Sequence, residues 1–394
     1  MRLYSSLMQG SEARGVRVVW LALAIAVFAA AFHRAATMRT ASSFHVGERS
    51  TRSPQIAEPI FEVGFASSGG TETVHSATAI EIAGGDLRAF WYGGSREGAK
   101  DVAIYSSVLD AETDSWGPEQ QVTTREETQK DLARYIKKLG NPVVARDREG
   151  RLWLFYVSVS LGGWSGSAIN ARTSIDDGRT WSRASRLVTS PFLNLSTLVK
   201  GPAIHYADGL LGLPVYHELL GKFSELVRLD EDARVVGKTR LSWGHSSLQP
   251  VVVPFDGERA LALMRRSGRS PPRILATETR DAGRHWTAPR PTSVSNPDAA
   301  IAALRSQDGE LLLAFNDSEH DRSHLTLALS SDRGQSWKNL YVLDPPTSVV
   351  AGTTRFAYPW LIQVTNGEFH LLYTWNRERI VHVRFNREWL LLNR

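Results

Sequence analysis

The sequence AGGDLRAFW, residues Ala83–Trp91, joins a glycine-rich turn to an alternating apolar strand. The pattern returns five times, at residues 148–156, 207–215, 255–263, 307–315 and 365–373. The turn glycines of the six copies are 65, 59, 48, 52 and 58 residues apart, and they are Gly85, Gly150, Gly209, Gly257, Gly309 and Gly367. Steps of this length are typical of propeller blades. The sequence therefore predicts an all-β, six-bladed β-propeller over residues 61–394.

The first blade indicates which strand ends meet. We expect strands at Thr73–Ile82, Leu87–Tyr92 and Asp101–Leu109, because these stretches alternate between apolar and polar residues. Successive strands of a blade run antiparallel. The start of the first strand, the end of the second and the start of the third therefore share one end, which we call the top. The hairpin turn and the turn after the third strand share the bottom.

Three bottom turns fit the pattern S/T-x-D-x-G-x-x-W, at Ser174–Trp181, Thr279–Trp286 and Ser330–Trp337. The Asp carboxylate can accept backbone N–H bonds, the Gly allows an unusual backbone conformation, and the Trp can pack between strands. We interpret these acidic residues as structural rather than catalytic, because they lie at the bottom of their blades.

The composition narrows the possible functions. The chain of 394 residues is 42% hydrophobic and 22% charged and contains no Cys, which excludes disulfides, thiolate metal sites and a Cys nucleophile. The formal charge of +5 slightly favours an anionic partner, but the basic residues are dispersed, so we expect no nucleic-acid partner. The histidines, His320 and His324 included, lack a metal-site spacing, and we expect neither a metal nor a cofactor.

The N-terminus contains one uncharged apolar run of 15 residues, Val18–Phe32. Arg2, Arg14 and Arg17 precede it, and positive charge before such a run keeps the N-terminus cytoplasmic. We expect a cytoplasmic segment at 1–17, a transmembrane anchor or signal segment at 18–36 and a linker at 37–60. An uncleaved anchor would hold the propeller on the periplasmic or extracytoplasmic side of the inner membrane, and a cleaved signal would release it. Both interpretations stay open.

A second helix is expected inside the propeller. Residues 126–138, EETQKDLARYIKK, indicate a helical insertion between the first two blades.

The repeated Asp-containing turns on a six-fold β pattern resemble the Asp-box (BNR) proteins of the sialidase superfamily. The resemblance extends from Val74 to the C-terminus, and residues 74–107 are especially similar to bacterial predicted neuraminidases. It implies a glycosidase that acts on an acidic sugar. Asp101 then matches the acid/base, Tyr358 the nucleophile, and Arg266 and Arg322 two of three arginines that bind the sugar carboxylate. The strand argument independently puts all four at the top.

Three departures from the sialidase pattern affect the expected chemistry. Ser76 stands where the first carboxylate-binding arginine is expected, and Thr374-Trp375-Asn376 replaces the glutamate that would brace it. The two losses fit each other, because a buried glutamate without its arginine would be an unpaired charge. Gln249 stands where a glutamate would activate the tyrosine, and an amide cannot take a proton.

The blade tops supply further candidates. His75, beside the missing arginine, is a candidate base near neutral pH. Arginine guanidinium groups bind both oxygens of a carboxylate, and side-chain amides hydrogen-bond to hydroxyl groups, so we expect a set of substrate-binding residues at the top. Its members are Arg266, Arg322, Arg96, Glu97, Asn141, Lys200, Gln249, Asn316 and Arg377. The alternative is that these residues have structural roles. The arginines would then form ion pairs, Tyr358 would pack between blades, Asp101 would cap a loop, and His75 would be a hydrogen-bonded core residue. His245 also falls at a blade top.

Three functions remain open from sequence. The first is hydrolysis of an acidic glycan, with Asp101 as acid/base and Tyr358 as nucleophile or cation stabiliser. The second is β-elimination on a uronate polysaccharide, with His75 or Tyr358 taking the proton. The third is an inactive glycan-binding propeller.

Overall fold

The computed structural model describes residues 2–36, 41–47, 58–190, 194–244, 246–268, 270–344 and 354–394. The chain forms two compact units, residues 1–40 and 41–394. His245 and most of the predicted linker lie outside the described residues.

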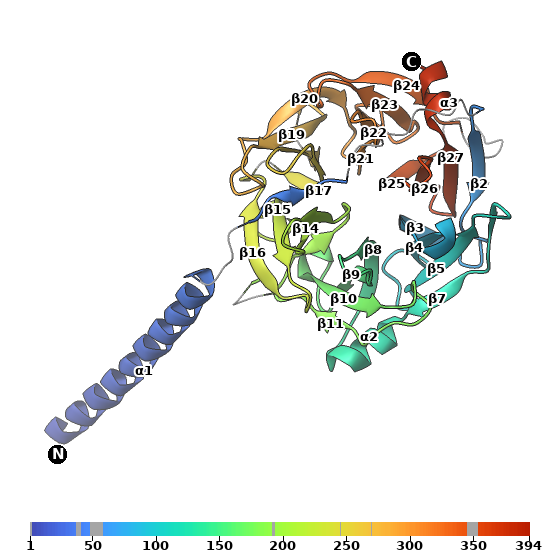
Figure 1. Ribbon diagram of the computed structural model, residues 1–394. Helices are drawn as coiled ribbons and strands as arrows, with labels where there is room; N and C mark the ends of the chain where they lie inside the picture. Colours follow the sequence, from blue (N-terminus) through green and yellow to red (C-terminus); the bar gives the residue numbers. More distant parts are fainter. Residues whose placement is uncertain are drawn as a thin grey trace. The chain divides into compact units, whose positions relative to one another are not determined.

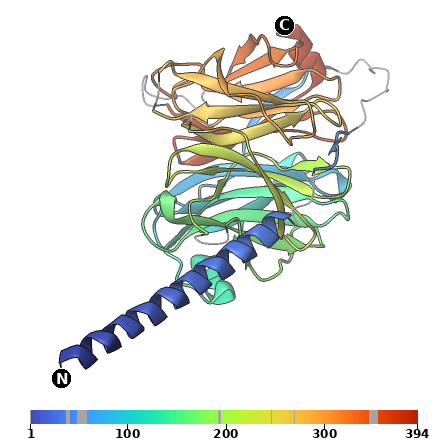
Figure 2. The ribbon, with the colours of Figure 1, turned by 90° about the vertical axis from the view of Figure 1, so that its left-hand side faces the viewer.

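The second unit is a ring of six antiparallel sheets, which confirms the predicted six-bladed propeller (Figure 1). A second view of the same ring is given in Figure 2. The first blade contains β3 (Thr73–Glu81), β4 (Leu87–Gly94), β5 (Ala103–Asp110), β6 (Ser115–Trp116) and β7 (Gln120–Thr123). The second contains β8 (Lys138–Arg146), β9 (Leu152–Val159), β10 (Ser167–Ser174) and β11 (Ser185–Arg186). The third contains β1 (Phe44–His45), β12 (Leu198–Val199), β13 (Ile204–Tyr206), β14 (Leu211–His217), β15 (Phe223–Leu229) and β16 (Val235–Arg240).

The other three blades have four strands each. The fourth blade contains β17 (Ser247–Pro254), β18 (Ala260–Arg266), β19 (Arg273–Thr279) and β20 (Arg290–Ser295). The fifth contains β21 (Ala302–Arg305), β22 (Leu311–Phe315), β23 (Thr326–Ser330) and β24 (Lys338–Val342). The sixth contains β25 (Phe356–Gln363), β26 (Phe369–Trp375), β27 (Arg379–Phe385) and β2 (Phe61–Phe65).

The ring is closed by an N-terminal strand that pairs with the last blade. Strand β2 pairs with β27, with Phe61 opposite Phe385, so an N-terminal strand completes the last blade. Strand β1 pairs with β13, and Phe44 is buried. Residues 41–47 therefore belong to the propeller rather than to the linker predicted over 37–60, because Phe44 adds apolar burial and backbone hydrogen bonds that a linker would lack.

The Asp-containing turns have the structural role predicted for them. In the first, the Asp176 carboxylate accepts from the Thr180 amide at 2.9 Å, Gly178 has a φ of 85°, and the Trp181 indole donates to the Gly178 carbonyl at 3.1 Å. The turn at Asp281 repeats this arrangement, and the turn at Asp332 repeats the carboxylate–amide bond and the positive φ at its glycine, but the Trp337 indole N–H has no partner among the described residues. These carboxylates are occupied by their own turns, at the bottom of their blades.

Both predicted helices are present. Helix α2 (Arg125–Leu132) lies between the first two blades and starts at a capping box, in which Thr124 and Glu127 each bond the other's backbone N–H. Helix α1 (Arg2–Ala36) contains the segment Gly15–His33, which is long and apolar enough to cross a membrane by length and composition. Membrane anchors and signal sequences share that property. A third helix, α3 (Arg387–Leu392), ends the chain.

A shared β-bulge marks the inner strand of four blades. The pairing register shifts between His75 and Thr78, Gly140 and Val143, Leu248 and Val251, and Ala357 and Trp360. Each bulge contains one residue with positive φ, and these are Ser76 (58°), Asn141 (41°), Gln249 (51°) and Tyr358 (53°). Such a conformation costs roughly 1–3 kcal/mol for a residue with a side chain and is concentrated at functional sites. The four bulges therefore put a strained residue at the top of each of these four blades.

Candidate active site

Tyr358 lies at the centre of a hydrogen-bonded group at the top of the propeller. Its hydroxyl oxygen accepts from Gln249 Nε2 at 3.0 Å, and Gln249 Oε1 accepts from Arg265 Nη1 at 3.2 Å. Arg265 Nε donates to a carboxylate oxygen of Asp298, and Arg322 Nη2 donates to the Asp298 main-chain carbonyl at 2.7 Å. The His75 ring lies 4.4 Å from the Tyr358 ring, centroid to centroid. We call these six residues, His75, Gln249, Arg265, Asp298, Arg322 and Tyr358, the top cluster.

The orientation of the Gln249 amide follows from its neighbours. A guanidinium has donors only, so the amide oxygen must face Arg265 and the amide nitrogen must face Tyr358. Tyr358 therefore receives a hydrogen bond from Gln249, and its own O–H proton must point elsewhere. This arrangement places a hydrogen-bond donor on the phenol oxygen but supplies no proton acceptor on that side.

The pKa values of the two arginines of the top cluster are shifted in opposite directions. Burial disfavours the charge of Arg265, but Tyr358 and Asp298 outweigh burial and raise the pKa of this guanidinium. Burial, together with Arg265, lowers the pKa of Arg322, although Tyr358 and Asp298 oppose that shift. Both guanidinium groups stay charged at neutral pH. Two positive charges therefore lie next to Tyr358, with one carboxylate between them.

His75 approaches Tyr358 from the first blade. Only 3% of its surface is exposed, and its Nδ1 has no hydrogen-bond partner among the described residues. Burial, with Arg377 and Arg322, lowers the pKa of His75 to about 3, so the imidazole is neutral. At neutral pH His75 is therefore a weak base.

Ser76, which stands where the first carboxylate-binding arginine is expected, contacts Thr374. The Ser76 backbone N–H donates to Thr374 Oγ1 at 3.1 Å, and both residues are buried. The two substitutions recognised in the sequence are therefore in direct contact.

The structure brings Arg265, rather than the predicted Arg266, to Tyr358. Side chains alternate between faces along a strand, so neighbouring arginines on β18 point in opposite directions. Arg266 Nη1 instead donates to the Pro271 carbonyl at 3.0 Å, in the loop that follows its own strand.

Asp101 does not join the top cluster. It is exposed, and its carboxylate accepts from the Ser95 amide at 2.8 Å and the Ser95 hydroxyl at 3.0 Å. The Ser95 backbone N–H holds the pKa of Asp101 below its usual value, with help from the Ser95 hydroxyl and Arg96. In this conformation Asp101 caps the loop and is ionised at neutral pH.

The remaining predicted residues have other partners. Glu97 forms an ion pair with Arg377 at 2.9 Å, and Arg96 is exposed. Asn141 donates to the Tyr216 hydroxyl at 3.1 Å. The other two bond only main-chain oxygens: Asn316 donates to the carbonyls of His324 and Phe356, and Lys200 to those of Ile301 and Pro359.

Two members of the top cluster, Arg265 and Asp298, were missed from the sequence. Both faces of β18 are apolar up to Met264, so the sequence did not show which of the two arginines points to the centre. Asp298 lies in a loop with a φ of 56° and follows no repeat. The one available signal was the pair Asn296-Pro297, which resembles Asn141-Pro142, Gln249-Pro250 and Tyr358-Pro359 at the other blade tops.

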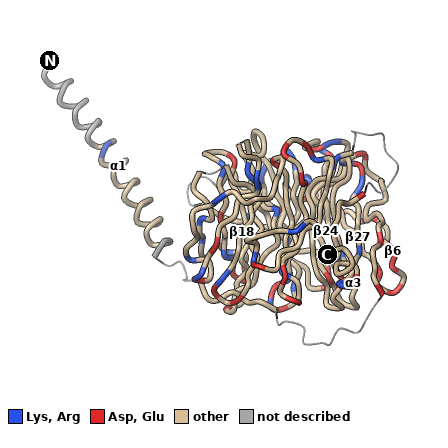
Figure 3. The backbone as a smooth tube through the Cα atoms, turned by 90° about the horizontal axis from the view of Figure 1, so that it is seen from above, with Lys and Arg blue, Asp and Glu red and all other residues tan. Residues whose placement is uncertain are grey.

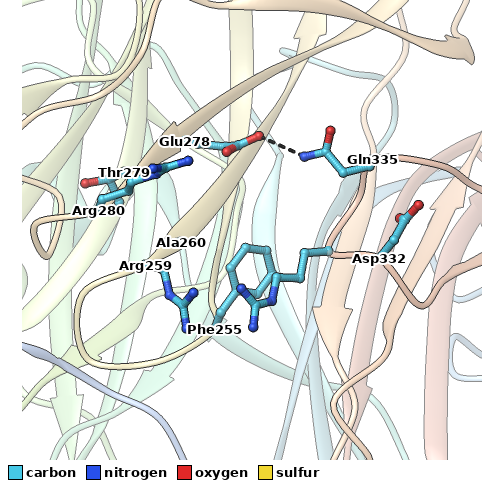
Figure 4. Close-up of a pocket in the computed structure, with 9 residues that line it drawn as sticks. Phe255, Arg259, Ala260, Glu278, Thr279, Arg280, Asp332 and Gln335 are labelled. Atoms are coloured by element: carbon cyan, nitrogen blue, oxygen red, sulfur yellow. Dashed lines mark hydrogen bonds between the residues drawn. The ribbon is translucent and has the colours of Figure 1, made fainter.

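A separate cavity lies at the bottom, between the fourth and fifth blades (Figure 4). Its volume is about 390 Å³, and its lining includes Phe255, Arg280 and Arg333. Glu278 in its wall bonds Arg290 and Gln335, and Asp332 is occupied by its own turn. Basic and acidic residues are interspersed over the rest of the propeller (Figure 3).

Comparison with known proteins agrees with this geometry. Residues 85–371 match the model of the BNR repeat-like domain. A sialidase of Micromonospora viridifaciens is 26% identical over 343 residues, which cover 78% of this chain and 50% of the relative, so the chain spans half the length of that protein.

Solved structures share the fold. The Hadza microbial sialidase Hz136 superposes with a TM-score of 0.68 at 17% identity, covering 83% of this chain and 68% of that one. The intramolecular trans-sialidase of Ruminococcus gnavus gives a TM-score of 0.64 at 13% identity, covering 84% and 98%. The match over residues 85–371 and the six sheets show that the chain belongs to the BNR repeat-like domain family, within the sialidase superfamily of propellers.

Proposed function

We propose that this protein is a sialidase-like glycoside hydrolase that acts on an acidic sugar at the end of a glycan. The observation that carries the proposal is the pair of guanidinium groups, Arg265 and Arg322, fixed on Asp298 beside the Tyr358 hydroxyl. Planar guanidinium groups match the two oxygens of a carboxylate. A sugar carboxylate bound there would bring its ring next to Tyr358.

Tyr358 is the group we propose to act at the anomeric carbon. The Gln249 N–H donates to the Tyr358 oxygen and two guanidinium groups lie nearby, an arrangement suited to a nucleophile or to a stabiliser of a developing cation. Gln249 cannot remove the phenol proton, so turnover through this residue would be slower than with a carboxylate in its place.

Asp101 remains our candidate for the acid/base, in a conformation other than the one described. The carboxylate must leave Ser95 to reach a leaving group at the top cluster, because in its present position both oxygens are bonded. Release would also remove the N–H bonds that lower its pKa and would make it a better proton donor.

A glycan-binding propeller without turnover is the second candidate, and the Gln249–Tyr358 hydrogen bond favours it. The top cluster keeps two carboxylate-binding arginines, yet the position of the base holds an amide. The β-elimination hypothesis has weaker support, because a neutral His75 with a pKa of about 3 is a poor base for a carbon acid.

The experiment uses the full chain in detergent with fluorogenic glycosides of N-acetylneuraminic acid and of glucuronic acid, and with a uronate polysaccharide. Free sugar without ultraviolet absorbance from an unsaturated uronate supports the hydrolase. Unsaturated product supports the lyase, and binding of the free sugars without turnover supports the binding propeller. Y358F should lose turnover, whereas Y105F, on β5 of the first blade, should keep it.

For the N-terminal segment, we propose that helix α1 exports the propeller and stays attached as an anchor, with the inner membrane as its partner. Arg34 and Arg39 directly follow the apolar run, as in a retained anchor rather than a cleavage site. N-terminal sequencing of the protein recovered from membranes tests this, because a new N-terminus near residue 32 would show cleavage instead.

A further inference from the structure

Among the predicted substrate-binding residues, Lys200 is the one positively charged side chain that the propeller buries almost completely. It follows β12, at the break between β12 and β13 in the inner part of the third blade. Only 2% of its surface is exposed, so a sugar bound above the top cluster cannot touch its amine. A buried lysine is costly, since burial alone lowers the pKa of Lys200 to about 7.

The Lys200 amine connects three blades. Its Nζ donates to the Ile301 carbonyl in the fifth blade at 2.8 Å and to the Pro359 carbonyl in the sixth blade at 2.5 Å. Pro359 directly follows Tyr358, and Ile301 follows Asp298 by three residues. One side chain thus holds the segment that presents the phenol and the segment that holds both arginines.

The next residue, Gly201, makes a similar contact with the fourth blade. A Cβ at Gly201 would lie 2.1 Å from the Pro250 carbonyl oxygen, so only glycine allows this approach. Pro250 directly follows Gln249. Residues 200 and 201 together therefore contact the backbone beside Gln249, Asp298 and Tyr358, three of the positive-φ positions at the top.

The charge of Lys200 has no partner of opposite sign. Among the described residues its amine bonds only the two main-chain oxygens, and burial is the sole cause of its pKa shift. A Met of similar length would avoid the desolvation cost but would leave both carbonyls unpaired. The strained Tyr358 bulge needs such an external restraint to persist.

We propose that Lys200 is a positioning residue, whose buried amine holds the Tyr358 and Asp298 segments in place. The catalytic part rests on the proposed function, whereas the restraint on the two backbone segments does not. Turnover and backbone protection are therefore measured separately.

The test compares the full-length protein with K200M and, as a matched control, K238M. Lys238 also donates to a main-chain carbonyl, that of Thr189 at 2.9 Å, but it lies on the outer strand β16. Hydrogen exchange should rise in K200M in peptides covering residues 298–303 and 356–361 and stay unchanged around the bottom hairpin at 306–310. K238M should leave all three regions unchanged.

Turnover of the glycoside cleaved by the wild type gives the second readout. We expect K200M to lower kcat by roughly 10-fold or more with KM within about threefold, because misplacing a catalytic group affects the reaction step more than binding. A global loss of structure would instead change all peptides and KM together.

The outcomes separate the two proposals. Unchanged exchange at 298–303 and 356–361 in folded K200M overturns the positioning role, whatever the turnover. Selective exchange with lower kcat and little change in KM supports it. If the wild type cleaves none of the glycosides, the proposed hydrolase function fails, and selective exchange in K200M still supports the restraint on the two segments. If exchange rises selectively but kcat stays unchanged, the catalytic part is overturned.

Discussion

The two sides of the top cluster hold their polar groups by different means. On the side of the fourth and fifth blades, Arg265 and Arg322 are charged and both bond Asp298. On the side of the first blade, His75 is neutral and Ser76 bonds Thr374 where a charged pair would be expected. In the proposed function, anion recognition is retained on the first side, the retained side, whereas a compact, uncharged contact stands in place of the expected charged pair on the other, the replaced side. The difference shows that charges around one site are lost in matched pairs, since a lone buried charge is costly.

The largest effect is expected from removing the charge on the retained side. R322M should weaken binding of 2-deoxy-2,3-didehydro-N-acetylneuraminic acid by roughly 100-fold, the effect of losing a charged hydrogen-bond partner. Arg322 donates only to a main-chain carbonyl, so its loss leaves no carboxylate unpaired. Isothermal titration calorimetry measures this, with R333M in the bottom cavity as control. Affinity within threefold of wild type in R322M would contradict the assignment.

The second effect tests the replaced side by restoring its charged pair. S76R alone should destabilise the propeller by roughly 2–3 kcal/mol, because it buries a guanidinium beside His75 without an acid. T374E alone should also destabilise, and the double variant should recover at least about 1 kcal/mol through mutual pairing. Denaturant unfolding of the full chain in detergent gives the coupling energy. Additive effects would show that the two sites do not form a pair.

The third effect concerns the neutral state of His75. The unfolded chain binds a proton on this residue below about pH 6.5, whereas the folded chain does so only near 3. The folded state therefore loses stability as pH falls from 6.5 towards 3, by roughly 2 kcal/mol at pH 5, and is unaffected above 6.5. In H75Q the slope of unfolding free energy between pH 6.5 and 4.5 should be smaller. Equal slopes in the two proteins would place the imidazole in contact with water.

A smaller effect is expected from replacing Gln249, on the retained side, with a carboxylate. Q249E puts a carboxylate between Arg265 and Tyr358, where it can accept the phenol proton and pair with the guanidinium. We expect kcat to rise by roughly 10-fold, which is less than the 100-fold or more typical of a general base in a site optimised for it. The control is Q121E, since Gln121 also donates to a tyrosine hydroxyl, that of Tyr105 at 3.5 Å, but on the outside of the first blade. No turnover in either the wild type or Q249E would favour the binding propeller, and a fall in kcat in Q249E would contradict the role proposed for position 249.

The sequence predicted the ring better than the site, for a physical reason. Hairpins such as Ala83–Trp91 depend on local turn chemistry and strand alternation, so each blade and its top end could be assigned from a few residues. Side-chain direction within the top cluster depends on bulges and burial instead. Arg266 was predicted in place of Arg265 because β18 is buried on both faces, and Lys200 was predicted as a ligand although its amine is covered by two other blades.

Asp101 shows the same limit in a loop. Its position at the start of the third strand was predicted from the blade pattern, and the carboxylate is indeed close to β5 (Ala103–Asp110). Its hydrogen bonds to Ser95 depend on the conformation of residues 95–101, which no repeat specifies. Chain position was therefore predictable, but not whether the carboxylate faces the top cluster.

The smallest effect is expected at the Arg377–Glu97 ion pair on the first-blade side. The Arg377 side chain is 57% exposed, and exposed pairs contribute only about 0–1 kcal/mol to stability. Arg377 nevertheless acts on His75, since it is one of the charges that lower its pKa. In R377M we expect thermal stability at pH 7 to change little and affinity for the same sialic acid analogue to fall by less than about threefold. A loss as large as that in R322M would mean that Arg377 supplies the third guanidinium missing at Ser76, and the two sides of the cluster would then bind the carboxylate together.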